Sequence, residues 1–582
     1  MASTAARRDW RGDALAAFVL ALVLALAWSW RDWHDLSALR LPDTDDVMRL
    51  QQIRDWLAGQ RFSDLSQHRL GADPGLAMHW SRLPDLVPGA IIAALAPMIG
   101  RHGAEVAAVI AWPALLLATA LFLIARIARA LGGPEIARTA LIVAAIAYPS
   151  STIFLPGRLD HHGLQVVLLL VIVHALIARS GMARGLIAGF AAAASIAIGL
   201  ETLPLIAVAG AVVVVGWIGR GSDDALMGFG IALAAGLLAA NTALRTDQFL
   251  YPACDGFTAI TWRVAQFAAF APIVLAIAGY ASKRSDVRSL LAGMAGAATA
   301  YFVWHTAPIC LSPYGQVDPL LARLWLAHVG EAQSLFAAPT VTAVGYAGLM
   351  VAGIVASLWR LWVTRNGLWW TVLAFQIGAL ALTCLQLRGA YAGAILAAPA
   401  LAAVIAVARR RGTPALAAAW IGSAGMLYPI AANAFVPVPQ GDGRPGTGGG
   451  SCTSPKALAR LARLPRGRLL APLDLGAYAI GATRLSVVGA PYHRGNAGNG
   501  AVYRFFLGPP AAAREIAKGW HVRYVALCPD SFGELGAADP RSLMARLRSG
   551  HAPAWMRPIE GPDDGLTLFE VQPRLFERPP TL

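Results

Sequence analysis

Three groups of acidic residues stand just outside long apolar runs of this sequence, where their carboxylates could bind a cation. They are Asp43-Thr44-Asp45-Asp46, Asp160-His161-His162 and the single acid Glu331. Neighbouring carboxylates repel one another unless a cation or an arginine offsets their charge. Asp offers a hard oxygen ligand and His a borderline nitrogen, which together suit Mn²⁺ or Mg²⁺ with some tolerance of Zn²⁺. The pattern therefore predicts a divalent metal site, and with it chemistry on a phosphate-linked substrate.

Each acidic group also has a simpler explanation, which the sequence leaves open. The first group precedes an amphipathic segment over 48–57, and the dipole of a helix favours acids at its start. The second group could be the polar cap of a tight hairpin, and Glu331 a solvated loop acid. Glu201, at another outer helix end, is a further acid of lower specificity.

The composition predicts a polytopic α-helical membrane protein. The chain has 582 residues, of which 57% are hydrophobic and 14% charged, and many apolar stretches reach the length of about 20 residues that crosses a bilayer. The net charge of +15 is spread over short loops at every second crossing, which is the positive-inside pattern and argues against a nucleic-acid surface. We predict about thirteen crossings, with a retained first helix and a cytoplasmic N-terminus, over 13–30, 104–127, 135–154, 163–179, 184–200, 203–219, 225–243, 262–281, 289–305, 340–361, 367–386, 389–408 and 414–435.

The chain divides into a membrane part and a soluble part. Residues 1–435 form the membrane domain with two large outer loops, 31–103 and 306–339, and the apolar stretch 88–99 is short enough to be interfacial or re-entrant. A Gly- and Pro-rich linker covers 436–451. Residues 452–582 alternate between helical and strand-like runs, so we predict an extracytoplasmic α/β domain. Its strands are expected at 468–470, 485–488, 522–527 and 566–571, and its helices at 454–464 and 511–519.

Two cysteines and two arginines add to this picture. Cys452 and Cys528 both fall in the soluble part, and an oxidising compartment would permit a disulfide between them.

Arg388 stands at the outer end of a crossing, where the positive-inside rule disfavours arginine. It could snorkel to the interface, or bind phosphate, which guanidinium grips bidentately. Arg82 lies in a polar and aromatic segment, 79–85, suited to a saccharide or a lipid phosphate.

This layout resembles the catalytic subunit of oligosaccharyltransferases, which belong to the GT-C class of polyprenyl-phosphate-dependent glycosyltransferases. The second-loop motif Gly-x-x-Asp-x-(Glu or His) of that family is matched by Gly157, Asp160 and His162. Its first-loop Asp, ahead of an amphipathic helix, fits Asp45 best, with Asp43 as the alternative. Its late-loop Glu is matched loosely by Glu331, and its arginine near the lipid phosphate would be Arg388.

The resemblance implies a metal-dependent glycosyltransferase with Asp45 and Glu331, or Asp43, as catalytic residues. It implies that Asp45, Asp160, His162 and Glu331 hold the divalent metal, Mn²⁺ or Mg²⁺. The donor would be a saccharide on polyprenyl (di)phosphate, and the acceptor a protein, a lipid or a polysaccharide at the periplasmic face of a bacterial inner membrane. The soluble domain of the family carries a Trp-Trp-Asp-Tyr-Gly motif, but the corresponding stretch here, 471–478, has no tryptophan. The acceptor-binding candidates are Asp474, Tyr478, His493 and Arg494.

Two other functions are compatible with a polytopic chain. A transporter or flippase of lipid-linked sugars would show charges near the middle of the membrane and broken helices in paired halves. The acids of this sequence fall at outer helix ends, and no pairing of halves is visible. A non-catalytic scaffold with a periplasmic binding domain is the remaining alternative.

Overall fold

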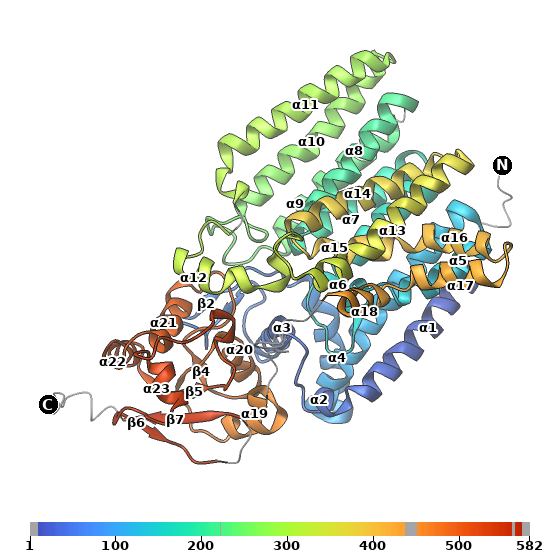
Figure 1. Cartoon of the computed structure of the whole chain (residues 1–582). Helices are drawn as coiled ribbons and strands as arrows, with labels where there is room; N and C mark the ends of the chain where they lie inside the picture. The colour runs from blue at the N-terminus through green and yellow to red at the C-terminus, as the bar shows by residue number, and fades with distance from the viewer. Residues whose placement is uncertain (1–9, 222, 313, 437–450, 562–564, 573–582) are drawn as a thin grey trace. The chain divides into compact units, whose positions relative to one another are not determined.

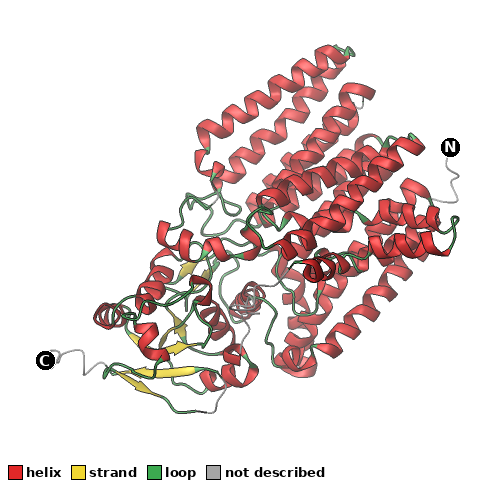
Figure 2. Ribbon diagram, in the orientation of Figure 1, coloured by secondary structure: helices red, strands yellow, loops and turns green. Residues whose placement is uncertain are grey.

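The protein folds into two compact units, as seen in a computed structural model that describes residues 10–221, 223–312, 314–436, 451–561 and 565–572. The first unit comprises Met1–Asp32, Trp80–Pro313 and Gly330–Val438. The second comprises Trp33–His79, Tyr314–Val329 and Pro439–Leu582. Figure 2 shows helices and loops in the first unit, and strands together with helices in the second.

The first unit is a bundle of apolar helices (Figure 1). Among the described residues, eight helices are long and apolar enough to cross a membrane, or nine if the bent pair α17–α18 is one span. Two further apolar helices, α6 and α8, are shorter. A polytopic membrane protein is thereby supported, whereas the count of about thirteen crossings stays a prediction. The helices are α1 (Trp10–Arg31), α4 (Leu86–Gly132), α5 (Pro134–Ala145), α6 (His162–Ala178), α7 (Gly181–Ile198), α8 (Leu203–Arg220), α9 (Asp223–Ala243), α10 (Ala259–Ala281), α11 (Ser285–Thr306), α13 (Thr340–Thr364), α14 (Leu368–Leu385), α15 (Gly389–Leu396), α16 (Ala398–Ala408), α17 (Thr413–Ser423) and α18 (Leu427–Phe435).

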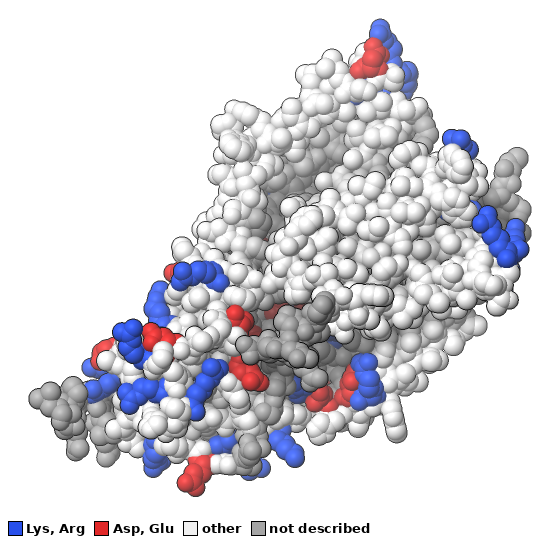
Figure 3. All heavy atoms as spheres, viewed as in Figure 1, with Lys and Arg blue, Asp and Glu red and all other residues white. Residues whose placement is uncertain are grey.

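Charged side chains are unevenly distributed over the two units. On the face shown in Figure 3 they gather at the helix ends of the first unit and leave the helix bodies almost bare. The second unit carries both signs of charge across the same view. A bare apolar belt between charged ends is what a bilayer requires of a helical bundle.

One predicted interfacial stretch and one predicted crossing differ in the structure. The apolar stretch 88–99 is part of α4, which continues to Gly132. This helix bends at Gly100, whose φ of 74° is a backbone conformation that glycine adopts without strain. The crossing expected over 135–154 ends as α5 at Ala145. A proline disfavours helical backbone in the residue before it, and here Pro149 follows Tyr148. A short 3-10 helix, Ser150–Phe154, then leads towards Asp160.

The second unit is built on a five-stranded mixed sheet in the order β4-β3-β5-β7-β6. β3 pairs in parallel with β4 and β5, while β7 pairs antiparallel with β5 and β6. The strands and helices predicted for the soluble part are all present within about two residues. The strands are β3 (Arg468–Leu470), β4 (Ser486–Val487), β5 (Val522–Leu527), β6 (Met556–Pro558) and β7 (Thr567–Val571), and the main helices are α19 (Pro455–Ala462), α20 (Leu473–Ala482), α21 (Asn496–Leu507), α22 (Pro510–Gly519) and α23 (Leu543–Arg548).

Parts of both predicted outer loops belong to the second unit. Arg69 donates from its guanidinium to the carbonyl oxygens of Ile480 at 2.8 Å and Thr483 at 2.7 Å. Leu321, on the short helix α12 (Pro319–Leu324), is buried in the core of this unit. The domain boundaries predicted at 435 and 452 therefore differ from the spatial division. The predicted linker, 436–451, lies almost wholly outside the described residues.

The structure contains two disulfides among the described residues. The predicted bond between Cys452 and Cys528 is confirmed. A second bond, which the sequence did not single out, joins Cys254 and Cys310 in the first unit. It ties the segment after α9 to the segment after α11.

Helices α7 and α9 approach so closely that two glycines are required between them. A Cβ added at Gly185 would overlap the carbonyl oxygen of Ala225, and one at Gly189 would overlap that of Phe229. These glycines are four residues apart and so lie on one helix face, the small-xxx-small arrangement of packed membrane helices.

Replacing Gly189 by leucine should therefore destabilise the protein by about 1–3 kcal/mol, the usual cost of overpacking. The measurement is the thermal unfolding temperature of the purified protein in detergent. Gly293→Leu on α11, where an added Cβ meets nothing within 4 Å, is the matched control. Equal melting temperatures for the two variants would contradict the close packing.

Candidate active site

The second acidic group is positioned by a turn that ends where α6 begins. The N–H of Gly157 donates to the carbonyl of Val109 on α4 at 2.8 Å, and its φ of 93° is open to glycine. Leu159 is buried and anchors the turn. Asp160, His161 and His162 follow directly, and α6 starts at His162. The turn thus presents three consecutive polar side chains at one helix end.

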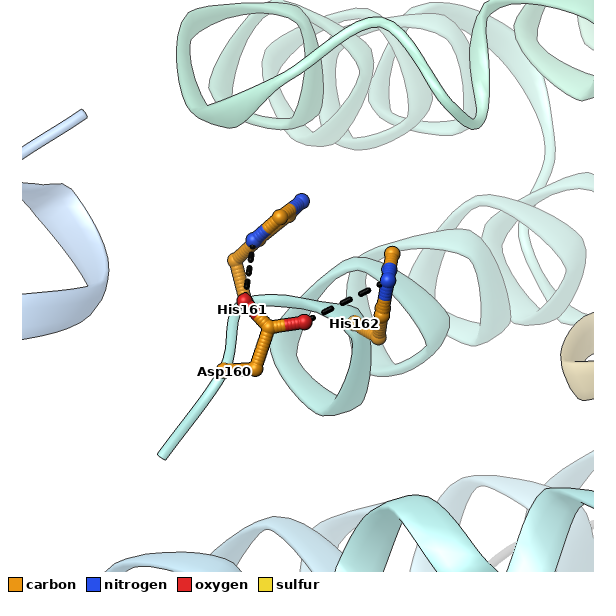
Figure 4. A group of neighbouring side chains, drawn as sticks. All are labelled: Asp160, His161 and His162. Carbon is orange, nitrogen blue, oxygen red and sulfur yellow. Dashed lines mark hydrogen bonds and ion pairs between the residues drawn. The ribbon is translucent and has the colours of Figure 1, made fainter. Parts of the chain in front are cut away.

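These three side chains are buried and contact one another (Figure 4). His161 Nδ1 lies 2.6 Å from Asp160 Oδ1, and His162 Nε2 lies 3.3 Å from Asp160 Oδ2. The carboxylate of Asp160 therefore divides its two oxygens between two imidazoles.

Glu201 faces the other side of His161 from the turn between α7 and α8. His161 Nε2 lies 3.1 Å from Glu201 Oε1. Because both ring nitrogens face carboxylates, both carry protons. Burial by itself lowers the pKa of His161, but the charges of Asp160 and Glu201 outweigh it and raise the pKa to about 10. In turn, the positive charge of His161 overcomes the effect of burial and holds the pKa of Glu201 well below its usual range.

Glu331 reaches the same place from a distant part of the chain. The loop that carries it is fastened to the junction of α14 and α15, where the N–H of Arg388 donates to the carbonyl of Glu331 at 3.2 Å and that of Leu387 to Gln333 at 2.9 Å. Glu331 Oε1 lies 3.2 Å from Arg388 Nη2, and its Oε2 lies 3.5 Å from His162 Nε2. Burial raises the pKa of Glu331, but Arg388 and His162 dominate and lower the pKa to about 2.

A pocket adjoins this group between α6, α8, α14 and α15. One part of its lining is ionic or polar and includes His162, Glu201 and Arg388. The other part is apolar and includes Val166 and Leu205. The pocket thus places ionic and apolar side chains next to one another.

The donor set suits a divalent cation. The nitrogen of His162 lies 3.3 Å from an oxygen of Asp160 and 3.5 Å from an oxygen of Glu331. Ligands that bind one ion at about 2.1 Å stand roughly 3.0–3.5 Å from one another. His161 does not fit the same role, because both of its nitrogens already face carboxylates. The structure thus brings together Asp160, His162 and Glu331, three of the four predicted ligands, and places His161 beside them.

The first acidic group lies in the second unit. Asp43 is the N-cap of α3 (Thr44–Leu57), and its Oδ1 accepts from the N–H of Asp45 at 3.1 Å. The capping explanation thus holds for Asp43. The part of Asp45 in the metal site stays a prediction.

The other predicted binding residues are partly engaged within their own units. Arg82 is only 1% exposed and pairs with Asp85 at 3.4 Å, and phosphate binding by Arg82 stays a prediction. Tyr478 is buried and donates its hydroxyl to the carbonyl of Leu41 at 2.9 Å. Arg494 faces the carbonyl oxygens of residues 77 and 78 at 3.4 Å. Asp474 is exposed in the first turn of α20, and the ring of His493 packs on that of His79 with centroids 4.4 Å apart.

Sequence reasoning did not predict that His161 and Glu201 take part in this site. His161 sits within the predicted motif, but its spacing does not reveal that it faces two carboxylates. In the sequence, Glu201 stands out only as an acid at a helix end. Its one local signal is an acid inside an apolar hairpin, where an ionised group needs a partner.

Comparison with known proteins shows which fold this chain has. No family model matches the sequence, and no curated protein matches it. Solved structures of the archaeal oligosaccharyltransferase AglB from Archaeoglobus fulgidus do resemble the chain. The complex of that protein with an inhibitory peptide and a dolichol-phosphate has a TM-score of 0.63 and 14% identity, over 88% of this chain and 69% of that one. The apo form has a TM-score of 0.64 and 15% identity, over 89% and 69%. The complex with Zn and sulfate has a TM-score of 0.61 and 15% identity, over 95% and 73%. The chain thus has an oligosaccharyltransferase-like GT-C fold.

The pairing of Arg388 with Glu331 should contribute measurably to stability. Arg388→Leu should lower the free energy of unfolding by about 2 kcal/mol, because it leaves acids in a largely buried site without their cation. The cost should be below that of a fully buried pair, since the side chain of Glu331 is 30% exposed. The loss of stability is measured by thermal unfolding of the purified variant in detergent.

Arg409→Leu is the matched control for this substitution. Arg409 pairs with Glu135 at 3.1 Å, but the two side chains are 48% and 42% exposed. Its loss should cost less than about 0.5 kcal/mol. A melting temperature of Arg388→Leu equal to that of this control would show that the buried pair does not stabilise the fold.

Proposed function

We propose that this chain is a glycosyltransferase of the bacterial inner membrane, similar to oligosaccharyltransferases, that moves a saccharide from polyprenyl (di)phosphate to an acceptor at the periplasmic face. One observation carries the proposal. Asp160, His162, Glu331 and Arg388, which come from three distant parts of the sequence, meet beside one pocket. They do so within a fold that resembles a solved oligosaccharyltransferase.

Asp160, His162 and Glu331 would hold a divalent metal, Mn²⁺ or Mg²⁺. Their mixed oxygen and nitrogen donors and their spacing support this assignment. The resemblance to a protein solved in complex with Zn and sulfate agrees with it. The ion would offset negative charge that develops on the phosphate leaving group. We retain Asp45 as a further ligand on the strength of the sequence motif alone.

Arg388 would bind the phosphate of the donor. Its guanidinium is 11% exposed and lines the pocket together with apolar side chains such as Leu205. A lipid phosphate requires this combination of a fixed cation and a hydrocarbon surface. The similar archaeal protein was solved with a dolichol-phosphate, which agrees with this class of donor.

The protein's own catalytic work would be positioning and charge stabilisation. The donor is already activated by its phosphate, so the barrier falls when the reacting groups are held in line within a preorganised electrostatic site. Glu331, and Asp45 by the family resemblance, would contact the acceptor nucleophile. Asp474 and His493 would contact the rest of the acceptor, which is a protein, or else a lipid or polysaccharide.

Neutralising the acids of the site should abolish transfer while the fold persists. Asp160→Asn and Glu331→Gln should each lower turnover of a radiolabelled polyprenyl-linked saccharide by about 100-fold or more, the usual effect of removing a charge that acts in the transition state. Turnover is measured on purified protein with matched melting curves. Glu135→Gln, at an exposed acid of the same unit, should leave turnover unchanged. Wild-type rates in both site variants would rule out this active site.

Removal of divalent metal should stop the reaction reversibly. Dialysis against a chelator should reduce turnover to background, and Mn²⁺ or Mg²⁺ should restore it, because a site of carboxylates and imidazole binds these ions reversibly. Turnover is followed during metal titration. Full activity after complete chelation, verified by elemental analysis, would mean that the acids and His162 act without a metal.

A further inference from the structure

The ring of His161 contacts one carboxylate oxygen of Asp160 and leaves the other oxygen facing the proposed metal ligands. A carboxylate has a broad torsional preference about its last bond and needs partners to fix it. His161 Nδ1 holds Oδ1 of Asp160 at 2.6 Å, while Oδ2 faces His162. The contact therefore selects which oxygen is presented to the proposed ligand set.

His161 is itself held from the opposite side by Glu201. Its Nε2 lies 3.1 Å from Glu201 Oε1, and Gln165 donates to Glu201 Oε2 at 3.0 Å. His161 and Gln165 are four residues apart and lie on the same face at the start of α6. Gln165 is 1% exposed and also donates to the carbonyl of Gly199 at 3.2 Å. The carboxylate of Glu201 is thus contacted at one oxygen by His161, the N-cap of α6, and at the other by Gln165 in the first turns of α6.

Glu201 also connects the two halves of the site. Arg388 Nη1 lies 4.0 Å from Glu201 Oε1, and Arg388 Nη2 lies 3.2 Å from Glu331 Oε1. A continuous series of contacts runs from Asp160 through His161, Glu201 and Arg388 to Glu331. The residues at its two ends are proposed metal ligands, whereas the middle residues are not.

We propose that His161 and Glu201 are positioning residues that hold Asp160 Oδ2 towards His162 and couple this oxygen to Arg388 and Glu331. The inference rests on the proposed function, because it concerns the same site. Supporting hydrogen bonds of this kind orient metal ligands, and their loss typically weakens metal affinity about 10- to 100-fold. His161 and Glu201 therefore set the affinity of the site without touching the ion.

The test measures Mn²⁺ binding by the full-length protein in detergent, with free Mn²⁺ followed by electron paramagnetic resonance and no donor present. His161→Gln and Glu201→Gln should each raise the Kd for Mn²⁺ about 10-fold or more. His174→Gln, which alters a histidine further along α6, is the matched control and should leave the Kd unchanged. At saturating Mn²⁺, kcat of both variants should return to within about threefold of wild type, because every proposed ligand remains.

Each other outcome rejects the inference in a distinguishable way. A Kd within twofold of wild type in both variants, with weakened binding in Asp160→Asn, would leave the metal site standing and remove the positioning role. Loss of kcat that saturating Mn²⁺ does not restore would make His161 or Glu201 part of the chemistry. If neither variant can be purified as a folded protein, the pair is needed for folding and not for orienting a ligand. Absence of Mn²⁺ binding by the wild-type protein would instead overturn the proposed metal-dependent function.

Discussion

The pairing of opposite charges in a largely buried site is the constraint on which the rest of the first unit depends. Three carboxylates lie close together in the first unit, those of Asp160 and Glu201 at the ends of apolar helices and that of Glu331 on a loop. Burial and mutual repulsion would each oppose their ionisation. His161 stands between two of them, and Arg388 lies between two as well. Because the cations are interleaved with the acids, the group keeps its charge and a defined geometry.

The backbone places these side chains at points where helices are interrupted. Asp160 and His161 precede α6, Glu201 lies in the turn between α7 and α8, and Arg388 lies between α14 and α15. Within a bilayer the backbone must satisfy its own hydrogen bonds, so irregular segments occur where protein covers them or where they line a cavity. The N–H groups of Leu387 and Arg388, which lie outside regular helix, satisfy this need by donating to carbonyl oxygens of the loop that carries Glu331. The interruptions thus serve both the backbone and the site.

The sequence predicted features that depend on local pattern, and missed those that depend on tertiary contact. Apolar runs and strand-like alternation indicated the helical unit and the elements of the sheet, because periodicity reports burial directly. The positions of Asp45, Asp160, His162 and Glu331 beside predicted outer helix ends suggested that they belong together, and contacts are seen among the last three. The partners of His161 could not be read in this way, since Glu201 is 40 residues away. The same holds for Arg69, which joins a predicted membrane loop to the second unit, and for Arg82, whose burial next to Asp85 no pattern indicates.

The division into two units also separates the proposed roles. The charges assigned to the donor lie in the helical unit, where each acid is balanced by a cation of that same unit. The residues assigned to the acceptor lie in the second unit, and two of them are already engaged there, Tyr478 by Leu41 and Arg494 by backbone carbonyls. Asp474 and His493 are left as the candidates for acceptor contact. The likeness to an oligosaccharyltransferase concerns the fold, and the stretch 471–478, which lacks tryptophan, is where this chain departs from the motif of that family.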